Sequence, residues 1–189
     1  MKKILLLLLV LCLTCTAAMA ETVTGVLFVD PSQSVSILLP EGYTIMDQEF
    51  LKQIQDPENI EILSEYSLDT DVINQLDLSS ISLAIAPDGQ STIDLMCIPT
   101  PGATNRALVL NKAALDDTMI ANYESFGVEV ISTDLSEIGD LYWYTCTISI
   151  DGEQYTVYIT CTDGYQVNIS MTGIPQEDIE PILMSLQVL

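Results

Sequence analysis

The sequence predicts an α+β fold in which helices pack on an antiparallel β-sheet. Three observations point to this class. Residues 128–172 read as consecutive strands joined by tight turns, which is typical of an antiparallel meander. Residues 111–126 carry apolar side chains at helical spacing. Two β-rich runs near the N-terminus are separated by a proline turn, so strands are expected both before and after this helix.

The N-terminus has the pattern of a secretory signal peptide. Residues 1–20 read MKKILLLLLVLCLTCTAAMA, with two lysines, an apolar run at 4–13 and the small-residue cleavage site Ala18-Met19-Ala20. The apolar run is shorter than the ~20 residues that a membrane span needs. We therefore expect cleavage after Ala20, a secreted bacterial protein with no membrane span, and a single domain over 21–189.

Proline, glycine and capping residues divide the first half of this domain into short elements. Strands are expected at 23–29, 34–39, 81–86 and 91–98, and the last two form a hairpin through the Pro-Asp-Gly-Gln turn at 87–90. Short helices are expected to begin near residues 47, 57 and 71.

The second half consists of one long helix, the meander and a closing helix. An apolar stripe predicts that the helix over 111–126 lies on the core, and Gly127 follows it in a C-terminal capping position. Strands fill 128–172, and 175–186 forms the closing helix. The stripe of the long helix comprises Leu115, Met119, Ile120, Tyr123 and Phe126.

The dipeptide Asp151-Gly152 predicts the register of the central hairpin. It is the strongest sequence signal for a two-residue type I′ turn. Such a turn pairs Ile150 with Glu153 and Cys146 with Val157. Apolar side chains then share one face of both strands, which supports this register.

A three-residue loop, Thr162-Asp163-Gly164, is expected at the next turn. It pairs Cys161 with Tyr165 and Ile159 with Val167, so that the apolar faces of these two strands also match. A two-residue turn would pair each apolar residue with a polar one. We therefore expect one buried face across the whole meander.

The cysteines are expected to be buried free thiols. In this register Cys146 and Cys161 share a face but lie about 13 Å apart along the ladder. A disulfide requires Cα atoms within roughly 7 Å, so these two residues should not pair. Cys97 could in principle reach either of them, and the sequence leaves that pairing open.

The charge of the chain excludes two classes of partner. The sequence has 27 Asp and Glu against five Lys and Arg, and two of these five leave with the signal peptide. Nucleic acid and anionic membranes both require Lys or Arg to neutralise phosphate, so neither is an expected partner. A cationic partner, Ca²⁺ or simple solubility remain compatible with the charge.

Catalytic machinery is sparse in the sequence. The absence of histidine removes Ser-His and Cys-His nucleophilic catalysis and the commonest zinc ligand. Carboxylate pairs such as Asp116-Asp117 and Glu177-Asp178 could act in a small secreted hydrolase, but solvation or helix-end placement explains them more simply. A calcium-loop-like series at 69–77 lacks the central Gly and terminal Glu. No enzyme, cofactor or metal is therefore expected.

The order of elements resembles the PsbP/Mog-like family. The resemblance rests on VSILLPEGY at 35–43, the helix and meander that follow, and IEPILMSL at 179–186. It implies an antiparallel β-sheet with helices packed on both faces, an α/β/α sandwich used mainly by accessory and binding proteins. It implies no catalytic set, because fold alone does not determine function.

One pair of aromatic residues is the candidate binding site. On the second face of the meander, Tyr158 is expected opposite Thr145 and diagonal to Trp143, among Thr, Ser and Asn side chains. Trp and Tyr dominate interface hot spots, whereas a single Trp in a small domain is more often packed in the core. The sequence thus predicts a secreted, non-catalytic interaction domain with an unidentified extracellular or cell-surface partner, and Trp143 and Tyr158 as its binding candidates.

Overall fold

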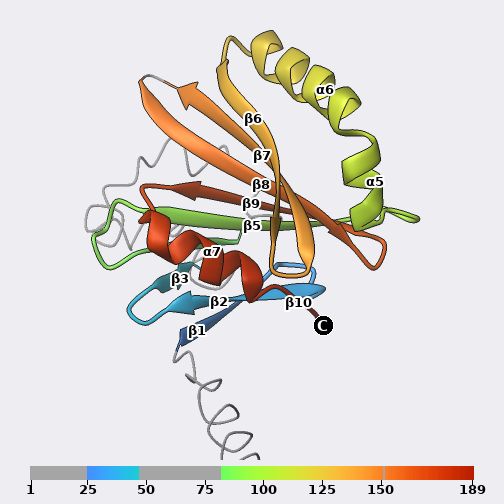
Figure 1. The fold of residues 1–189 in the computed structure, drawn as a ribbon. Helices are drawn as coiled ribbons and strands as arrows, with labels where there is room; N and C mark the ends of the chain where they lie inside the picture. Colours follow the sequence, from blue (N-terminus) through green and yellow to red (C-terminus); the bar gives the residue numbers. More distant parts are fainter. Residues whose placement is uncertain (1–24, 47–81, 151) are drawn as a thin grey trace, which may run out of the picture.

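The computed structural model describes residues 25–46, 82–150 and 152–189 (Figure 1). The expected signal peptide, the short helices beginning near 47, 57 and 71, and the calcium-loop-like series lie outside these residues. The described strands are β1 (Gly25–Val29), β2 (Val35–Pro40), β3 (Thr44–Met46), β4 (Leu83–Ile85), β5 (Thr92–Pro99), β6 (Glu129–Ile138), β7 (Leu141–Ile150), β8 (Glu153–Thr162), β9 (Tyr165–Thr172) and β10 (Gln187–Val188). The described helices are α5 (Asn105–Leu110), α6 (Lys112–Ser125) and α7 (Gln176–Met184).

Two antiparallel sheets form the scaffold. The larger sheet has seven strands in the order β3-β4-β5-β9-β8-β7-β6, and the smaller has three in the order β1-β2-β10. Every pair of described strands is antiparallel, as a hairpin-rich sequence requires. The predicted antiparallel sheet is confirmed, and the described helices are compatible with the α+β class. No helix within the described ranges is long and apolar enough to cross a membrane.

The central hairpin has the predicted register. Ile150 pairs with Glu153 and Cys146 pairs with Val157 across β7 and β8. The turn chemistry of the sequence was sufficient here, because a two-residue loop leaves only one way to align the strands.

The register predicted between β8 and β9 is wrong by one residue. Thr162 pairs with Tyr165 and Thr160 with Val167, so the turn consists of Asp163 and Gly164 alone. Both turn residues have positive φ, 49° and 83°, as a type I′ turn requires. The shift moves the apolar side chains of β9 to the face opposite the one expected.

The larger sheet is consequently buried on both faces, against two separate cores. One face of β7 and β8 contributes Tyr144, Cys146 and Ile159 to a core beneath α5 and α6. The other face contributes Trp143 and Tyr158 to the main core, which also contains the apolar side chains of β9. Further members of the main core come from the smaller sheet and α7: Phe28, Val35, Ile37, Leu39, Ile182 and Leu183.

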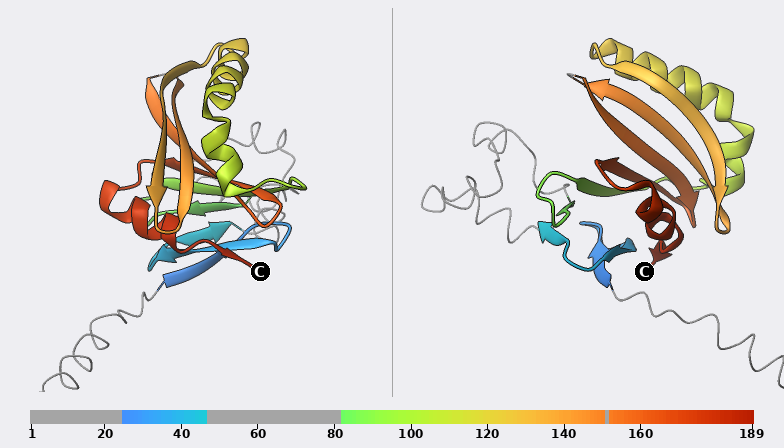
Figure 2. Two further views of the ribbon diagram at one scale, coloured as in Figure 1. Left: turned by 45° about the vertical axis from the view of Figure 1, so that its right-hand side comes forward. Right: turned by 60° about the vertical axis from the view of Figure 1, so that its left-hand side comes forward.

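Helices cover the first face, whereas the second face packs on the smaller sheet together with α7 (Figure 2). The described residues therefore do not show the layer of helices on both faces that the family resemblance implies. On the first face, the predicted stripe of α6 is correct for Leu115, Met119 and Tyr123, which pack on the sheet. Phe126 follows the helix and is 83% exposed, so its assignment to the stripe is wrong.

All three described cysteines are free thiols. Cys146 and Cys161 belong to the core beneath α5 and α6, as expected for buried small side chains. Cys97 packs against the main core on the opposite face of the sheet. The sheet itself therefore separates Cys97 from the other two, which settles the pairing that the sequence left open.

Asn105 takes the place of a strand where β7 and β8 separate. The pairing between these strands ends at Tyr144. Beyond this residue, the Asn105 Oδ1 accepts from the Tyr142 backbone N–H at 2.7 Å. The Asn105 amide nitrogen donates to the Tyr142 carbonyl and to the Thr160 hydroxyl, both at 2.8 Å. One side chain thus satisfies the backbone of β7 and fixes the start of α5 on the sheet.

Strand β6 forms one edge of the larger sheet. Its pairing with β7 shifts between Val130 and Ser132, which leaves Ile131 as the extra residue of a β-bulge. The strand also carries three acidic residues, Glu129, Asp134 and Glu137.

Candidate functional site: an acidic pocket around Tyr43

Both aromatic residues proposed from the sequence lie inside the protein. Trp143 has no exposed surface and Tyr158 is 8% exposed, and both belong to the main core. Thr160, one of the polar neighbours expected around this pair, is also fully buried. Their burial agrees with the packing interpretation, and this pair forms no exposed recognition surface in the structure.

A different site emerges where three turns meet at one end of the molecule. A pocket of about 340 Å³ opens between the β2–β3 turn, the β4–β5 turn and the start of α7. Its polar lining is acidic, from Glu41, Asp88 and Asp178, and Tyr43 and Ser91 complete it. Its apolar walls are the side chains of Pro40, Ala86, Pro87 and Pro175.

The first two turns are held together by a close contact at Gly42. This residue has φ of +94°, and a Cβ atom built on it would lie 2.9 Å from the Cγ of Pro87. Only glycine meets both conditions without strain. The contact fixes Glu41 beside the turn that contains Asp88.

Asp88 holds the second turn in place. Its Oδ1 accepts from the backbone N–H groups of Gln90 and Ser91, both at 2.8 Å, and its Oδ2 accepts from the Ser91 hydroxyl at 2.5 Å. The same hydroxyl lies 2.9 Å from the Gly173 carbonyl oxygen, just before α7. Ser91 therefore connects the β4–β5 turn to the segment that precedes α7.

Tyr43 forms the floor of the pocket. Its ring belongs to the main core and the residue is 9% exposed, while its side chain also lines the pocket. The pKa of its phenol is raised by burial and by the negative charges of Asp178 and Asp88. The hydroxyl has no hydrogen-bond partner within the described ranges. The buried side-chain polar atoms of the described residues that lack a partner are Ser36 Oγ and Trp143 Nε1, so the Tyr43 hydroxyl reaches the surface of the pocket and is accessible to a ligand.

The pocket is better suited to binding a positive charge than to acid–base catalysis. Hydrogen bonds from Ser91 and Gln90 lower the pKa of Asp88, so its carboxyl stays ionised and cannot serve as a general acid near neutral pH. No three acidic or cysteine side chains of the described residues lie close enough to hold a metal ion. What remains is a preformed anionic cavity with one free hydroxyl.

Other reactive groups in the described ranges have structural roles. The Asp30 carboxylate is buried and accepts from the backbone N–H groups of Ser32, Ser34 and Val35, which forms the β1–β2 turn. Burial, with the charge of Asp30, raises the pKa of the Cys97 thiol to about 11, so this cysteine is a poor nucleophile.

The pocket was missed because each of its parts reads as an ordinary turn. The three segments are Pro-Glu-Gly at 40–42, Pro-Asp-Gly at 87–89 and Pro-Gln-Glu-Asp at 175–178. Each places acidic residues just after a proline, and this shared pattern is the sequence signal that was available. Only the sheet order, with β3, β4, β5 and β9 side by side, brings the three turns to one end.

Comparison with known proteins supports the fold alone. No protein-family model matches the sequence, and no curated protein matches it. The solution structure of cyanobacterial PsbP (CyanoP) from Synechocystis sp. PCC 6803 is similar at a TM-score of 0.52 and 10% identity, covering 90% of this chain and 96% of that one. A crystal structure from Bacteroides thetaiotaomicron VPI-5482 matches at a TM-score of 0.45 and 16% identity, over 87% of this chain. The chain spans about half, 48%, of the length of that second structure. The fold is therefore PsbP-like.

Proposed function

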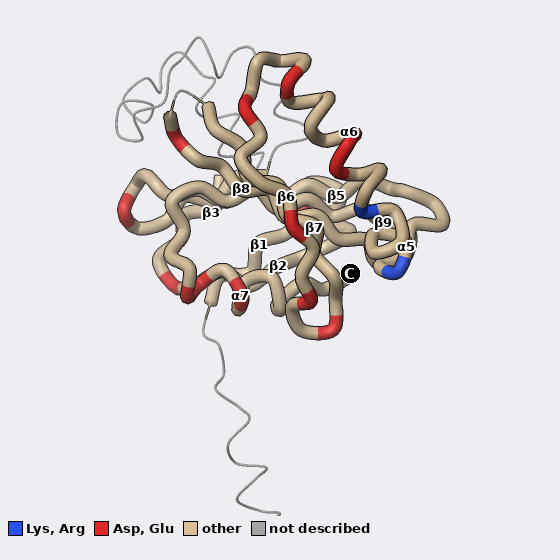
Figure 3. The backbone as a smooth tube through the Cα atoms, turned by 45° about the horizontal axis from the view of Figure 1, so that its top comes forward, with Lys and Arg blue, Asp and Glu red and all other residues tan. Residues whose placement is uncertain are grey.

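We propose that the chain is an exported, non-catalytic binding domain whose acidic end docks a basic region of an extracellular or cell-surface protein. The observation that carries this proposal is that the described cations lie away from the pocket, whereas acidic residues are spread over the surface (Figure 3). The two described cations, Arg106 and Lys112, lie on α5 and α6 (Figure 3). The end around the pocket carries Glu41, Asp88, Glu177 and Asp178, which we call the acidic face.

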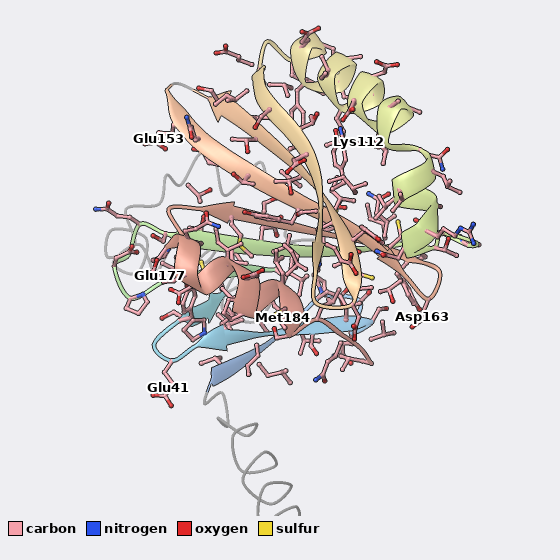
Figure 4. The ribbon with its side chains drawn as sticks, in the orientation of Figure 1. Glu41, Lys112, Glu153, Asp163, Glu177 and Met184 are labelled. Atoms are coloured by element: carbon pink, nitrogen blue, oxygen red, sulfur yellow. The ribbon has the colours of Figure 1, made fainter. Side chains whose placement is uncertain are left out.

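The acidic face can attract a positively charged partner, because no described Lys or Arg forms an ion pair with its carboxylates. The one ion pair of the described residues joins Lys112 to Asp116 at 2.8 Å on α6. Glu41 and Glu177 point outward at the same end of the molecule, away from Lys112 (Figure 4). A surface of one sign attracts a partner of the opposite sign and accelerates its association.

Export is the second part of the proposal. The lysine pair, apolar run and Ala18-Met19-Ala20 site of residues 1–20 support processing after Ala20. Intact-mass analysis of the protein recovered from its native host should give Glu21 as the first residue. Retention of residues 1–20, or a lipid on Cys15, would contradict this.

The test of docking uses two double variants with the same change in charge. Glu41→Gln/Glu177→Gln removes charge from the acidic face, whereas Asp117→Asn/Glu124→Gln removes it from α6. Protein immobilised and exposed to the native extracellular fraction should retain a basic protein that elutes at about 0.5 M salt, because salt screens surface charge. Retention should fall only for the acidic-face variant. Equal retention by both variants would exclude the acidic face as the docking surface.

A small secreted hydrolase that uses a carboxylate pair is the alternative function. It would have to use this pocket, because three carboxylates line it. Because hydrogen bonds lower the pKa of Asp88, this residue could serve only as the ionised member of such a pair, and Glu41 or Asp178 would have to supply the proton. Hydrolysis of model glycosides that disappears in both Asp88→Asn and Asp178→Asn would favour the enzyme over the binding domain.

A further inference from the structure

The pocket around Tyr43 has a shape and a set of acceptors that point to one class of ligand. The identity of the molecule that bears this ligand group rests on the proposed function. Binding of the group itself does not, because the pocket can be tested with a small probe in the absence of any partner. Three features decide the ligand class: the geometry of the acceptors, the apolar walls and the size of the cavity.

The acceptors that line the cavity come from separate segments. Glu41 belongs to the first turn, Asp88 to the second and Asp178 to the first turn of α7, and the Tyr43 hydroxyl lies at the floor. Within the described residues, Asp88 Oδ2 accepts one hydrogen bond, from the Ser91 hydroxyl, so it retains a free lone pair. Acceptors on several sides match a donor group whose N–H bonds diverge.

A primary ammonium group meets this requirement better than a guanidinium or a metal ion. Its three N–H donors diverge from one nitrogen, whereas the planar fork of a guanidinium favours two parallel bonds to a single carboxylate. The described acidic side chains do not converge closely enough to coordinate a metal. A cavity of about 340 Å³ is also much larger than one bare ion needs.

The apolar walls suit the chain that carries such a group. Pro40, Pro87 and Pro175 line the same cavity as the acceptors. An alkyl stem can pack on these rings while its charged head remains among the carboxylates, as lysine side chains commonly do. The proline and glycine turns also keep the walls in place before a ligand arrives, which lowers the entropy cost of binding.

We propose that this pocket is a receptor for a primary alkylammonium group, and specifically for a lysine side chain of the basic partner. The ammonium nitrogen donates to the Tyr43 hydroxyl oxygen and to the carboxylate of Asp178, and Glu41 and Asp88 supply negative charge around it. A free alkylamine offers the same chemistry, and the test separates these two sources.

The first arm of the test titrates the purified protein with Nα-acetyl-lysine amide, followed by nuclear magnetic resonance. Amide signals of residues around Tyr43 and Asp178 should shift and saturate. Nα-acetyl-norleucine amide, which lacks the charge, and the trimethylated lysine derivative, which lacks the N–H donors, should bind at least about tenfold more weakly. Equal binding of the lysine and trimethyl-lysine probes, or preferential saturation by Ca²⁺, would overturn the proposal.

The second arm uses variants. Asp178→Asn and Tyr43→Phe should each weaken binding of the lysine probe by about tenfold, because hydrogen bonds to a charged group are among the stronger ones. Glu124→Gln, which removes the same charge from α6, should leave binding unchanged. Equal weakening by Asp178→Asn and Glu124→Gln would show attraction to the overall charge alone and would overturn the pocket.

A third readout reports on the hydroxyl directly. An ammonium group bound beside Tyr43 stabilises the phenolate, so the lysine probe should lower the pKa of Tyr43. The ultraviolet titration of wild type minus that of Tyr43→Phe isolates this one tyrosine. The comparison is made on the lower limb of the titration, below about pH 9.5, where the lysine ammonium is still protonated. An unchanged Tyr43 limb at a saturating probe concentration would exclude contact with the hydroxyl.

The last arm distinguishes this inference from the proposed function. If the lysine probe binds as described but the captured partner is retained equally by wild type and Asp178→Asn, the partner docks elsewhere and the lysine assignment is overturned in favour of a free alkylamine. If the probe fails to bind while partner capture still depends on the acidic face, the proposed function stands and the pocket inference fails.

Discussion

Asn105 shows how one side chain can substitute for part of a strand. It pairs with both the N–H and the carbonyl of Tyr142, where the ladder between β7 and β8 has ended. Asn105→Ala would leave the Tyr142 N–H without its partner, whereas the Tyr142 carbonyl would keep the Thr160 hydroxyl at 2.9 Å, so we expect a loss of about 1–3 kcal/mol in the free energy of unfolding.

Urea denaturation of Asn105→Ala and of a matched control measures this loss. Asn122 lies exposed on α6, and its side chain makes no hydrogen bond with the described residues. Asn122→Ala should therefore change stability by no more than about 0.5 kcal/mol. Equal stability of the two variants would mean that water replaces Asn105 without cost.

Asp94 makes stability depend on pH in the direction opposite to a paired carboxylate. Burial raises its pKa to about 6 in the folded protein, against 3.8 for a fully solvated aspartate side chain. The folded state therefore holds this proton more tightly than the unfolded state, and its stabilising effect is full below about pH 3.8 and disappears as pH rises through about 6.

Asp94→Asn should remove this dependence. At pH 7.5 the variant should be more stable than wild type by up to about 3 kcal/mol, and the difference should shrink towards zero by pH 4. Thermal unfolding of both proteins across this range gives the measurement. A variant that is less stable than wild type at pH 7.5 would show that the carboxylate charge is compensated in the folded state.

At the scale of whole elements, the sequence predicts what short-range chemistry determines. The β7–β8 register followed from Asp151-Gly152, and the inner stripe of α6 followed from helical spacing. The β8–β9 register did not follow, because β8 is buried on both faces: Ile159 and Thr160 point to opposite cores, and both are almost fully buried. A strand without a polar face carries no periodic signal for register.

The pocket could not be predicted for a related reason. Its three turns were each expected from proline and glycine, but their meeting depends on the pairing of β5 with β9, which joins Thr92 to Thr172. Local sequence patterns contain no information on such distant pairs. The acidic residues therefore looked like ordinary solvated turn residues.

Helix α6 should be less stable than the strands beneath it. None of its residues is fully buried, and it is attached by a partly buried stripe and by the Tyr144 hydroxyl, which donates to Asp116 at 3.1 Å. Elements with few buried contacts open locally at low free energy. Hydrogen exchange of α6 amides should be faster than that of β8 and β9, and equal protection would show that α6 unfolds only with the whole domain.

For the whole molecule, Trp143 reports on the main core. It is the only tryptophan in the sequence and is fully buried where the two sheets and α7 pack. Trp143→Ala should cost about 3–5 kcal/mol, whereas the same change at Tyr142, which is 37% exposed, should cost far less. Acrylamide should quench the native fluorescence weakly, and strong quenching would contradict the burial.

The position of β6 at the edge of the larger sheet has a consequence for colloidal behaviour. Its outer backbone groups could template a strand from another copy, and its bulge at Ile131 and its acidic residues oppose this. The bulge is permanent, but the charge is not, since carboxylates lose it below about pH 4. Acidification should therefore turn mutual repulsion into edge-to-edge aggregation, and an outward-facing lysine in β6 should protect the protein under acid where more carboxylates would not.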